Sequence, residues 1–374
     1  MYKALLVVSG LLVFVVGSAF LTPEGEDDGL RALYSRPITE WPTPDIDSGI
    51  HWQEFEALPG PDTSYFRIIS QPKEALGKLL FFDPLLSGSN QISCSSCHDP
   101  QRSWADQRSV ALGNDHLQGM RNTPSLLNVG ARKSLFWDGR ALTLESQVLS
   151  PIEAHHEMAS DPQEIREKLE AIPRYRELFA EAYGDSVASF DRVGEALAAF
   201  QRTIIGRRSR FDRFVEGEYE RLTDQEIKGL HLFRTKARCM NCHFGPHFTD
   251  EQFHNIGLTY YKRKYEDLGR YEVTKDPEDV GRFRTPSLRD VMHNDPWMHN
   301  GLFSNIMGVV NIYNSGMHMI NPSAEEKAAD PLYPVTDPIL RPLELTADEK
   351  EAVVAFLGAI TATQYRMQRP ELPR

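Results

Sequence analysis

The pattern C-x-x-C-H occurs twice in this chain of 374 residues, and the two copies use all four of its cysteines. The first copy reads CSSCH and the second reads CMNCH. The six residues that define the copies are Cys94, Cys97, His98, Cys239, Cys242 and His243. Four cysteines could form two structural disulfides in an exported protein. Two identical short spacings, each followed by a histidine, argue against that use.

Three kinds of site contain a C-x-x-C pair, and their requirements differ. A dithiol oxidoreductase uses one pair in a βαβ setting and needs no histidine after it. A zinc site needs two pairs that share one ion, whereas the pairs here begin at residues 94 and 239 and each has its own histidine. C-x-x-C-H is the attachment pattern of c-type haem, in which both thiols bind the porphyrin and the histidine binds the iron. The sequence therefore predicts two covalently bound c-type haems, with His98 and His243 as proximal ligands.

The N-terminus has the features of an export signal. One lysine precedes an apolar run from Ala4 to Leu21, and an acidic stretch follows. We predict that residues 1–22 are a signal peptide, or an uncleaved membrane anchor because the run is nearly long enough to span a bilayer. The mature protein is then periplasmic. The net charge of −12 argues against nucleic acid as a partner, since no basic stripe offsets the acidic total.

The predicted fold is mostly α, with two cytochrome-c-like haem domains, long loops and haems near the domain interface. Residues 23–65 combine prolines, acids and aromatic residues without a period, which predicts an extended N-terminal arm. We expect the N-terminal haem domain at 66–220 and the C-terminal haem domain at 221–374. A weak repeat supports duplication of one domain, because T-P-S-L, an aromatic residue and then D-G or N-G follow each haem motif.

Helices are indicated by apolar spacing and by capping boxes. The spacing of one helical face is found at Val193, Leu197, Phe200 and Ile204. The pattern T-x-x-E at residues 223–226 and 346–349 predicts the start of two further helices. Alternating Val, Ile and Thr runs are scarce, so little β-sheet is expected.

The second axial position of each iron separates an electron carrier from an enzyme. A c-type haem with protein ligands on both faces passes electrons, whereas an open face can bind and cleave peroxide. Cleavage also needs a base that takes a proton from one oxygen and returns it to the other. Two haems permit a division of labour, with one open iron for chemistry and one closed iron for storage of an oxidising equivalent.

The chain resembles the bacterial dihaem cytochrome c peroxidase/MauG superfamily over about residues 70–362. The motifs that carry the resemblance, in family order, are ALGKLLFFDPLLS, CSSCHDP, RNTPSLLN, FWDGRA, CMNCHFGPHFTDEQFHNIG, RTPSLRDV and LTADEKEAVVAFL. The resemblance implies a peroxidatic haem at His98 and an electron-transfer haem at His243. It also implies that Trp137 conducts electrons between the haems.

The resemblance further implies a distal pocket and a calcium site. Glu157 matches the acid/base of peroxide cleavage, and Gln147 and Pro151 match positions lining the same pocket. The calcium ligands would be Asn122 and backbone carbonyls around Arg284 and Pro286, which suit a hard ion that prefers oxygen. Five other histidines are interpreted as loop residues (His155 and His156) or as packing or haem-propionate contacts (His247, His254 and His299).

Two positions depart from the peroxidase pattern. The histidine that closes the N-terminal haem in typical peroxidases falls at Asn114, and His116 lies two residues away. We therefore expect an always-open N-terminal haem, as in MauG-like members, with His116 as the alternative ligand. The distal ligand of the second haem falls at Phe303, which cannot bind iron. The alternatives are Met307, Met317 and Met319 or a five-coordinate haem.

Three functions follow in order of preference. The first is a peroxidase that reduces hydrogen peroxide with electrons from a small cytochrome c or cupredoxin. The second is a MauG-like enzyme that uses peroxide to oxidise tryptophan or tyrosine residues of a partner protein. The third is a dihaem electron carrier without peroxide chemistry. Dimers are frequent in the family, so a homodimer is an expected assembly.

Overall fold

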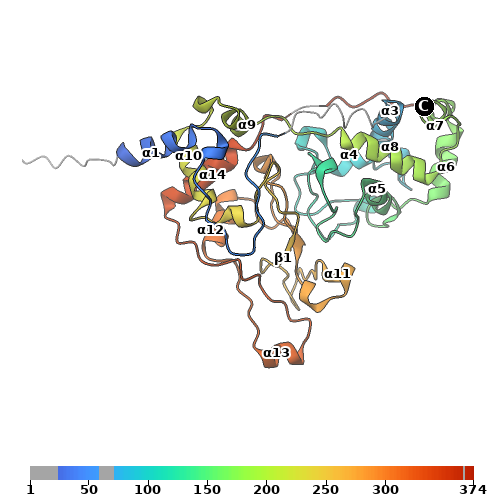
Figure 1. The fold of residues 1–374 in the computed structure, drawn as a ribbon. Coiled ribbons are helices and arrows are strands. Elements are labelled where there is room, and N and C mark those ends of the chain that lie inside the picture. Colours follow the sequence, from blue (N-terminus) through green and yellow to red (C-terminus); the bar gives the residue numbers. More distant parts are fainter. Residues whose placement is uncertain (1–23, 59–70, 365–366) are drawn as a thin grey trace, which may run out of the picture.

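The structure is a computed structural model that describes residues 24–58, 71–364 and 367–374. The predicted signal peptide or anchor at 1–22 lies outside the described residues. Within the described ranges, none of the helices combines the length and the apolar character needed to cross a bilayer. Two helical lobes lie side by side, with β1, α11 and α13 below them (Figure 1).

Six α-helices of the N-terminal lobe lie in the described ranges. They are α3 (Gln71–Phe82), α4 (Cys94–Cys97), α5 (Leu144–Glu153), α6 (Pro162–Ala171), α7 (Pro173–Tyr183) and α8 (Phe190–Arg202). The predicted apolar face of α8 is confirmed, because Val193, Leu197 and Phe200 are buried in the core of this lobe. Long loops join the helices, so side chains near the haem motif come mainly from loops and helix ends.

The C-terminal lobe repeats this arrangement around a second core. Its helices are α9 (Arg210–Val215), α10 (Asp224–Arg234), α11 (Tyr271–Thr274), α12 (Ile306–Asn314), α13 (Ala324–Ala329) and α14 (Ala347–Ala359). Both predicted capping boxes are present, one before α10 and one before α14. The only two strands in the described ranges are β1 (Phe253–His254) and β2 (Phe283–Arg284), which pair antiparallel. The prediction of a mostly α fold is therefore confirmed.

Short 3-10 helices punctuate the loops of both lobes. They are η1 (Ile38–Glu40), η2 (Pro84–Leu86), η3 (Pro100–Arg102), η4 (Asn114–His116), η5 (Val129–Ala131), η6 (Tyr219–Arg221), η7 (Cys239–Asn241), η8 (Pro277–Asp279) and η9 (Val291–His293). The T-P-S-L segments lead into η5 and η9, at equivalent places in the two lobes.

A glycine allows the principal helix pair of each lobe to pack closely. A Cβ on Gly77 of α3 would lie 1.8 Å from the backbone oxygen of Ala196 in α8. A Cβ on Gly229 of α10 would lie 1.9 Å from the backbone oxygen of Ala352 in α14. The same contact in both lobes supports the duplication predicted from the sequence.

The chain ends differ from the predicted domain limits. The arm is not wholly extended, since residues 24–34 form helix α1, which packs against α10. Tyr34, Trp41 and Phe55 are buried in the C-terminal core because the arm supplies part of its apolar surface. Phe211 and Phe214 of α9 also belong to this core, although they precede residue 221. The tail at 367–374 returns to the N-terminal lobe (Figure 1).

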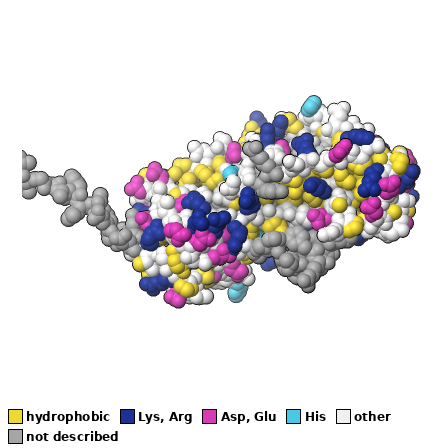
Figure 2. Space-filling view, turned by 90° about the horizontal axis from the view of Figure 1, so that it is seen from above, with side chains coloured by type: hydrophobic (Ala, Val, Ile, Leu, Met, Phe, Trp, Pro, Cys, Tyr) yellow, Lys and Arg dark blue, Asp and Glu magenta, His cyan; other side chains and the backbone are white. Residues whose placement is uncertain are grey.

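The surface seen from above carries charges of both signs. Lysine and arginine side chains alternate with aspartate and glutamate on this face, without a continuous basic stripe (Figure 2). Exposed ion pairs occur on the described surface, such as Lys73 with Glu195 at 2.9 Å. Such pairs contribute little to stability individually.

Candidate functional site

One large cavity connects the two lobes. Its volume is about 980 Å³, at the upper end of the range for ligand pockets. All six residues of the two C-x-x-C-H motifs line it. The cavity is also lined by three residues predicted to act in the distal pocket or between the haems, namely Glu157, Gln147 and Trp137.

The two motif histidines are oriented in the same way. The Nδ1 of His98 is 3.0 Å from the backbone oxygen of Trp104, and the Nδ1 of His243 is 2.9 Å from that of Phe248. Each Nδ1–H therefore donates to a carbonyl, which leaves Nε2 as the atom able to bind iron. Burial lowers the pKa of both imidazoles and favours the neutral form that ligates metals.

The motif cysteines are free thiols placed on short helical turns. Cys94 and Cys97 bound α4, and Cys239 begins η7, so each pair faces the cavity from one turn. In both motifs the amide of the histidine donates to the carbonyl of the first cysteine at 2.9 Å. Burial raises the pKa of Cys94, Cys97 and Cys239 to about 12. The turn thus presents two sulfurs and one imidazole together, as thioether attachment requires.

A buried arginine with two unpaired donors supports the fit of a haem to the second motif. Arg238 directly precedes Cys239 and lines the cavity. Its Nη2 donates to Asp47, but its Nε and Nη1 are buried without a partner among the described residues. Unpaired buried donors are costly, and a haem propionate would supply the missing acceptors.

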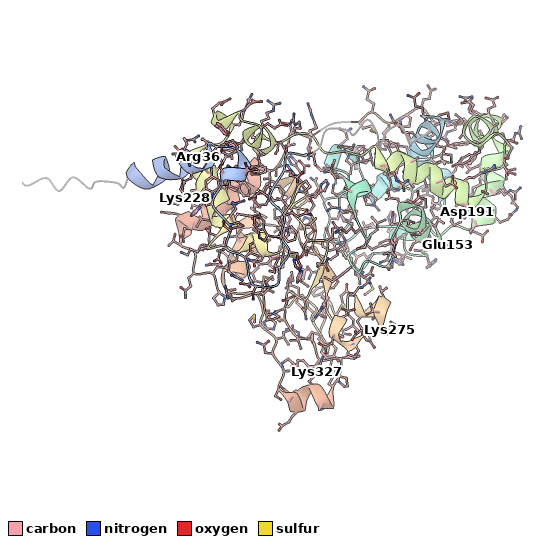
Figure 3. All side chains as sticks on the ribbon, viewed as in Figure 1. Arg36, Glu153, Asp191, Lys228, Lys275 and Lys327 are labelled. Atoms are coloured by element: carbon pink, nitrogen blue, oxygen red, sulfur yellow. The ribbon has the colours of Figure 1, made fainter. Side chains whose placement is uncertain are left out.

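The helix α5 and the loop that follows it form the wall of the cavity near the first motif. Gln147 and Pro151 lie on the cavity side of α5, and Glu157 lies four residues beyond its end. Burial raises the pKa of Glu157, while the nearby charges of His156 and Arg140 lower it. Glu153, on the last turn of α5, is exposed and does not line the cavity (Figure 3).

The loop that contains Asn114 and His116 is held against the Glu157 loop. The amide of Asn114 donates to the carbonyl of Glu157 at 2.7 Å. A Cβ on Gly113 would lie 2.1 Å from the backbone oxygen of His156, so the two loops touch through their backbones. His116 is exposed and does not line the cavity. The structure therefore does not bring this candidate sixth ligand to the first haem site.

Sequence reasoning missed Tyr313, which lines the cavity near the second motif. One face of α12, formed by Ile306, Val309, Val310 and Tyr313, borders the cavity. Burial, with the nearby sulfurs of Cys242 and Cys239, raises the pKa of Tyr313. The candidates Met307, Met317 and Met319 are absent from the cavity lining, as is Phe303.

The internal repeat explains the position of Tyr313. Helices α5 and α12 begin at the same distance after Trp137 and His299, at N-caps Thr143 and Asn305. In this register Tyr313 of the C-terminal lobe corresponds to Pro151 of the N-terminal lobe. The C-terminal lobe therefore has a phenol at the position where the N-terminal lobe has a proline ring. Extending the repeat from Trp137 and His299 to the predicted pocket position Pro151 leads to Tyr313, which is the signal that the sequence offers for it.

Trp137 lies where the two lobes meet. Its indole Nε1 donates to the backbone oxygen of Asn122 at 2.9 Å, and its own carbonyl accepts from the amide of Arg284 at 2.8 Å. Asn122, Arg284 and Pro286 all line the cavity, as expected for the predicted calcium ligands. The Nδ2 of Asn122 donates to Arg108, which leaves its Oδ1 as the free oxygen.

The remaining histidines occupy distinct environments. His299 is buried, and burial lowers its pKa to about 4. His254 lies 2.9 Å from Asp250 and 2.6 Å from Asp337; burial opposes its charge, but these hydrogen bonds raise its pKa to about 12. Cys242 lies close enough to Asp250 and His254 for the three to bind a metal. Thioether formation would remove that thiolate, so the haem and such an ion exclude each other.

The chain is similar to a known protein family, to characterised relatives and to a solved structure. Residues 71–220 match the family model described as di-haem cytochrome c peroxidase. The chain is 36% identical over 307 residues to a methylamine utilization protein MauG from Methylophilus methylotrophus, covering 80% of this chain and 86% of the relative. It is 34% identical over 300 residues to a cytochrome c551 peroxidase from Nitrosomonas europaea, covering 80% and 82%. The crystal structure of a MauG-like protein associated with microbial copper homeostasis superposes with a TM-score of 0.70 at 32% identity, covering 85% of this chain and 96% of that one.

Proposed function

This chain belongs to the di-haem cytochrome c peroxidase family, which includes MauG proteins, and from that premise we propose that it reduces hydrogen peroxide at the His98 haem. The family carries two c-type haems and consists of peroxidase-type oxidoreductases. The observation that carries the proposal is the part of the cavity beside the first motif, where Glu157 and Gln147 line the wall and His116 does not. Peroxide at a haem held by this motif would meet the Glu157 carboxylate.

The chain's own residues bind peroxide and move its protons. A haem held by Cys94, Cys97 and His98 would supply an iron for cleavage of the oxygen–oxygen bond. Glu157 takes the proton of the oxygen that binds and returns it to the oxygen that leaves as water. Burial raises the pKa of this carboxyl, and a carboxyl of raised pKa is a better acid and base near neutral pH. Gln147 offers an amide that can hold the peroxide in place.

Replacement of Glu157 tests the proposal. Glu157→Gln keeps the size of the side chain but removes the base, so peroxide turnover is expected to fall about a hundredfold or more. Glu153→Gln is the matched control, because Glu153 is exposed nearby and does not line the cavity. Both variants are compared at equal haem content with a reduced small cytochrome as donor. Equal turnover in Glu157→Gln and Glu153→Gln would remove Glu157 from the reaction.

A second candidate function is favoured by Tyr313. A tyrosine ligand stabilises oxidised iron, so a Tyr313-ligated second haem would store an oxidising equivalent for the oxidation of tryptophan or tyrosine residues in a partner protein, as in the MauG-like alternative. The distinguishing measurement is the lifetime of the state formed by one equivalent of peroxide. Rapid decay with every small donor protein supports the peroxidase. A state that persists for minutes with small donors, but decays on adding a tryptophan-bearing protein, supports the alternative.

An electron carrier without peroxide chemistry is the least supported candidate. It requires a protein ligand on both faces of each iron, and His116 is outside the first pocket. The resting ferric protein is therefore expected to show a high-spin signal from one haem. Two purely low-spin haems would favour the carrier.

Calcium binding and export complete the proposal. Asn122 and the carbonyls of Arg284 and Pro286 provide oxygen atoms for a calcium ion between the lobes. Metal analysis before and after a chelator, with Asn122→Ala as the comparison, tests this site.

The apolar N-terminal run supports export to the periplasm, where a small cytochrome or cupredoxin would supply electrons.

A further inference from the structure

Glu157 needs a supply of protons during turnover, and the imidazole of His156 lies beside it. Reduction of hydrogen peroxide to two waters consumes two electrons and two protons. The peroxide's own protons suffice for the first water, so the second water requires two protons from solvent. If Glu157 delivers them, its carboxylate must regain a proton twice in each turnover.

His156 is placed to give that proton. Its Nε2 lies 3.6 Å from Oε1 of Glu157, and both side chains line the cavity. The distance is about 0.4 Å beyond the usual limit of an N–H···O hydrogen bond, so a small rotation of the imidazole closes it. The His156 side chain is 50% exposed and that of Glu157 is 37% exposed, so the histidine is the more accessible partner.

We propose that His156 is the proton donor that recharges Glu157, an inference that rests on the proposed peroxide reduction. In this step the Nε2–H bond of the His156 imidazolium breaks and an O–H bond forms on Glu157. His156 then takes a replacement proton from solvent, and no electron moves. An imidazole suits this exchange because its ordinary pKa of about 6.5 lies near neutral pH.

The backbone holds the pair together. The carbonyl of Glu157 accepts the amide of Asn114 at 2.7 Å, and Gly113 packs on the carbonyl of His156. These contacts fix two consecutive residues on one loop, so the side chains share one wall of the cavity. The sequence itself places a titratable donor next to the base.

One other cation acts on Glu157 from a different segment. Arg140, from the turn after Trp137, lines the cavity and is paired with Asp138 at 2.9 Å. Its guanidinium stays protonated at any ordinary pH, so it can hold the carboxylate but cannot recharge it. Of the two described groups whose charge lowers the pKa of Glu157, only the imidazole is a side-chain type that exchanges protons near neutral pH.

The test compares two neighbouring histidines in the haem-loaded protein. His156→Gln removes the donor, and His155→Gln is the matched control because His155 is exposed and does not line the cavity. Peroxide turnover is measured from pH 5 to 9 with a saturating reduced cytochrome. In the wild type and His155→Gln, the maximal rate is expected to fall as rising pH deprotonates the histidine. In His156→Gln, this alkaline limb is expected to disappear and the rate at pH 6 to fall about tenfold.

Two further readouts separate a proton donor from a structural residue. Imidazole added to His156→Gln is expected to restore at least half of the lost rate. His156→Lys keeps a donor of higher pKa, so its alkaline limb is expected to move to higher pH, and this variant decides the question if His156→Gln loads haem poorly. An unchanged pH profile in both His156 variants overturns the inference while Glu157→Gln remains inactive. Wild-type turnover equal to that of Glu157→Gln overturns the proposed function, and this inference with it.

Discussion

Trp137 and His299 occupy equivalent positions in the two lobes, and their rings meet edge to face with centroids 6.4 Å apart. Each is held by the opposite lobe. The amide of Asn122 donates to the carbonyl of His299 at 2.7 Å, and the amide of Arg284 donates to that of Trp137 at 2.8 Å. Asn122 and Arg284 are themselves equivalent, since each precedes T-P-S-L. A reciprocal pair of hydrogen bonds therefore fixes the aromatic contact between the two lobes.

This contact predicts that Trp137 controls electron flow between the haems. Trp137→Phe removes the indole and its hydrogen bond to Asn122, so transfer between the haems is expected to slow by about tenfold or more, a barrier increase of about 1.4 kcal/mol. Peroxide binding at the first haem is expected to be unchanged. Stopped-flow absorbance of the second haem after peroxide addition measures the step.

A matched control for the loss of a tryptophan is Trp41→Phe. Trp41 is buried in the C-terminal core and does not line the cavity. Its replacement is expected to lower stability without slowing transfer. A Trp137→Phe protein that transfers electrons as fast as Trp41→Phe would contradict the assigned route.

Tyr313 is predicted to be the second axial ligand of the His243 haem. Tyr313→Phe removes the only oxygen of this side chain, so the second haem is expected to gain high-spin character. Tyr313→Met is expected to raise its reduction potential, on the order of 0.1 V or more, because thioether ligands favour ferrous iron. Electron paramagnetic resonance and a redox titration measure these effects. Met317→Leu, outside the cavity lining, should leave both readouts unchanged; a spectral change in that variant alone would reassign the ligand.

The acid side of the pH profile is predicted to report Glu157. Burial raises the pKa of Glu157, while His156 and Arg140 lower it. The active form is the carboxylate, so activity is lost as pH falls through this pKa, above the ordinary value of about 4.3. Arg140→Gln removes one stabilising cation and is expected to move this acid limb to higher pH. The measurement is kcat/KM for peroxide against pH, and an acid limb that stays in place would show that Arg140 does not act on the base.

Patterns that depend on local chemistry were readable from the sequence. C-x-x-C-H and the two T-x-x-E boxes are short motifs whose geometry is set within one turn, and all four form the expected turns. Glu157 and Trp137 were located by register from family motifs, and both line the cavity. Their chemical roles stay predictions.

Features that depend on packing between distant segments were not readable in the same way. Tyr313 was missed because its place follows from the start of α12, which the sequence does not mark with a capping box. The arm was expected to be extended, but Tyr34, Trp41 and Phe55 cover the C-terminal core. Prolines and acids dominate its composition, whereas three aromatic side chains decide where it lies.

The close packing of α10 against α14 in the C-terminal lobe predicts that alanine at Gly229 lowers the free energy of unfolding. A Cβ on Gly229 would lie 1.9 Å from the backbone oxygen of Ala352 and 2.9 Å from Cβ of Phe356. Backbone cannot move as a side-chain end can, so Gly229→Ala must separate α10 from α14. Overpacking of this kind costs about 1–3 kcal/mol of unfolding free energy, and a backbone clash puts Gly229→Ala at the upper end.

Gly358 gives the matched control within the same helix pair. It also lies in α14, but a Cβ there would meet nothing within 4 Å. Gly358→Ala is therefore expected to be neutral or to stabilise the protein by about 0.5–1 kcal/mol, because alanine loses less backbone entropy in a helix. Denaturant unfolding of both haem-loaded variants measures the difference. Similar midpoints for the two variants would mean that α10 and α14 tolerate separation, and the equivalent contact at Gly77 should then tolerate alanine as well.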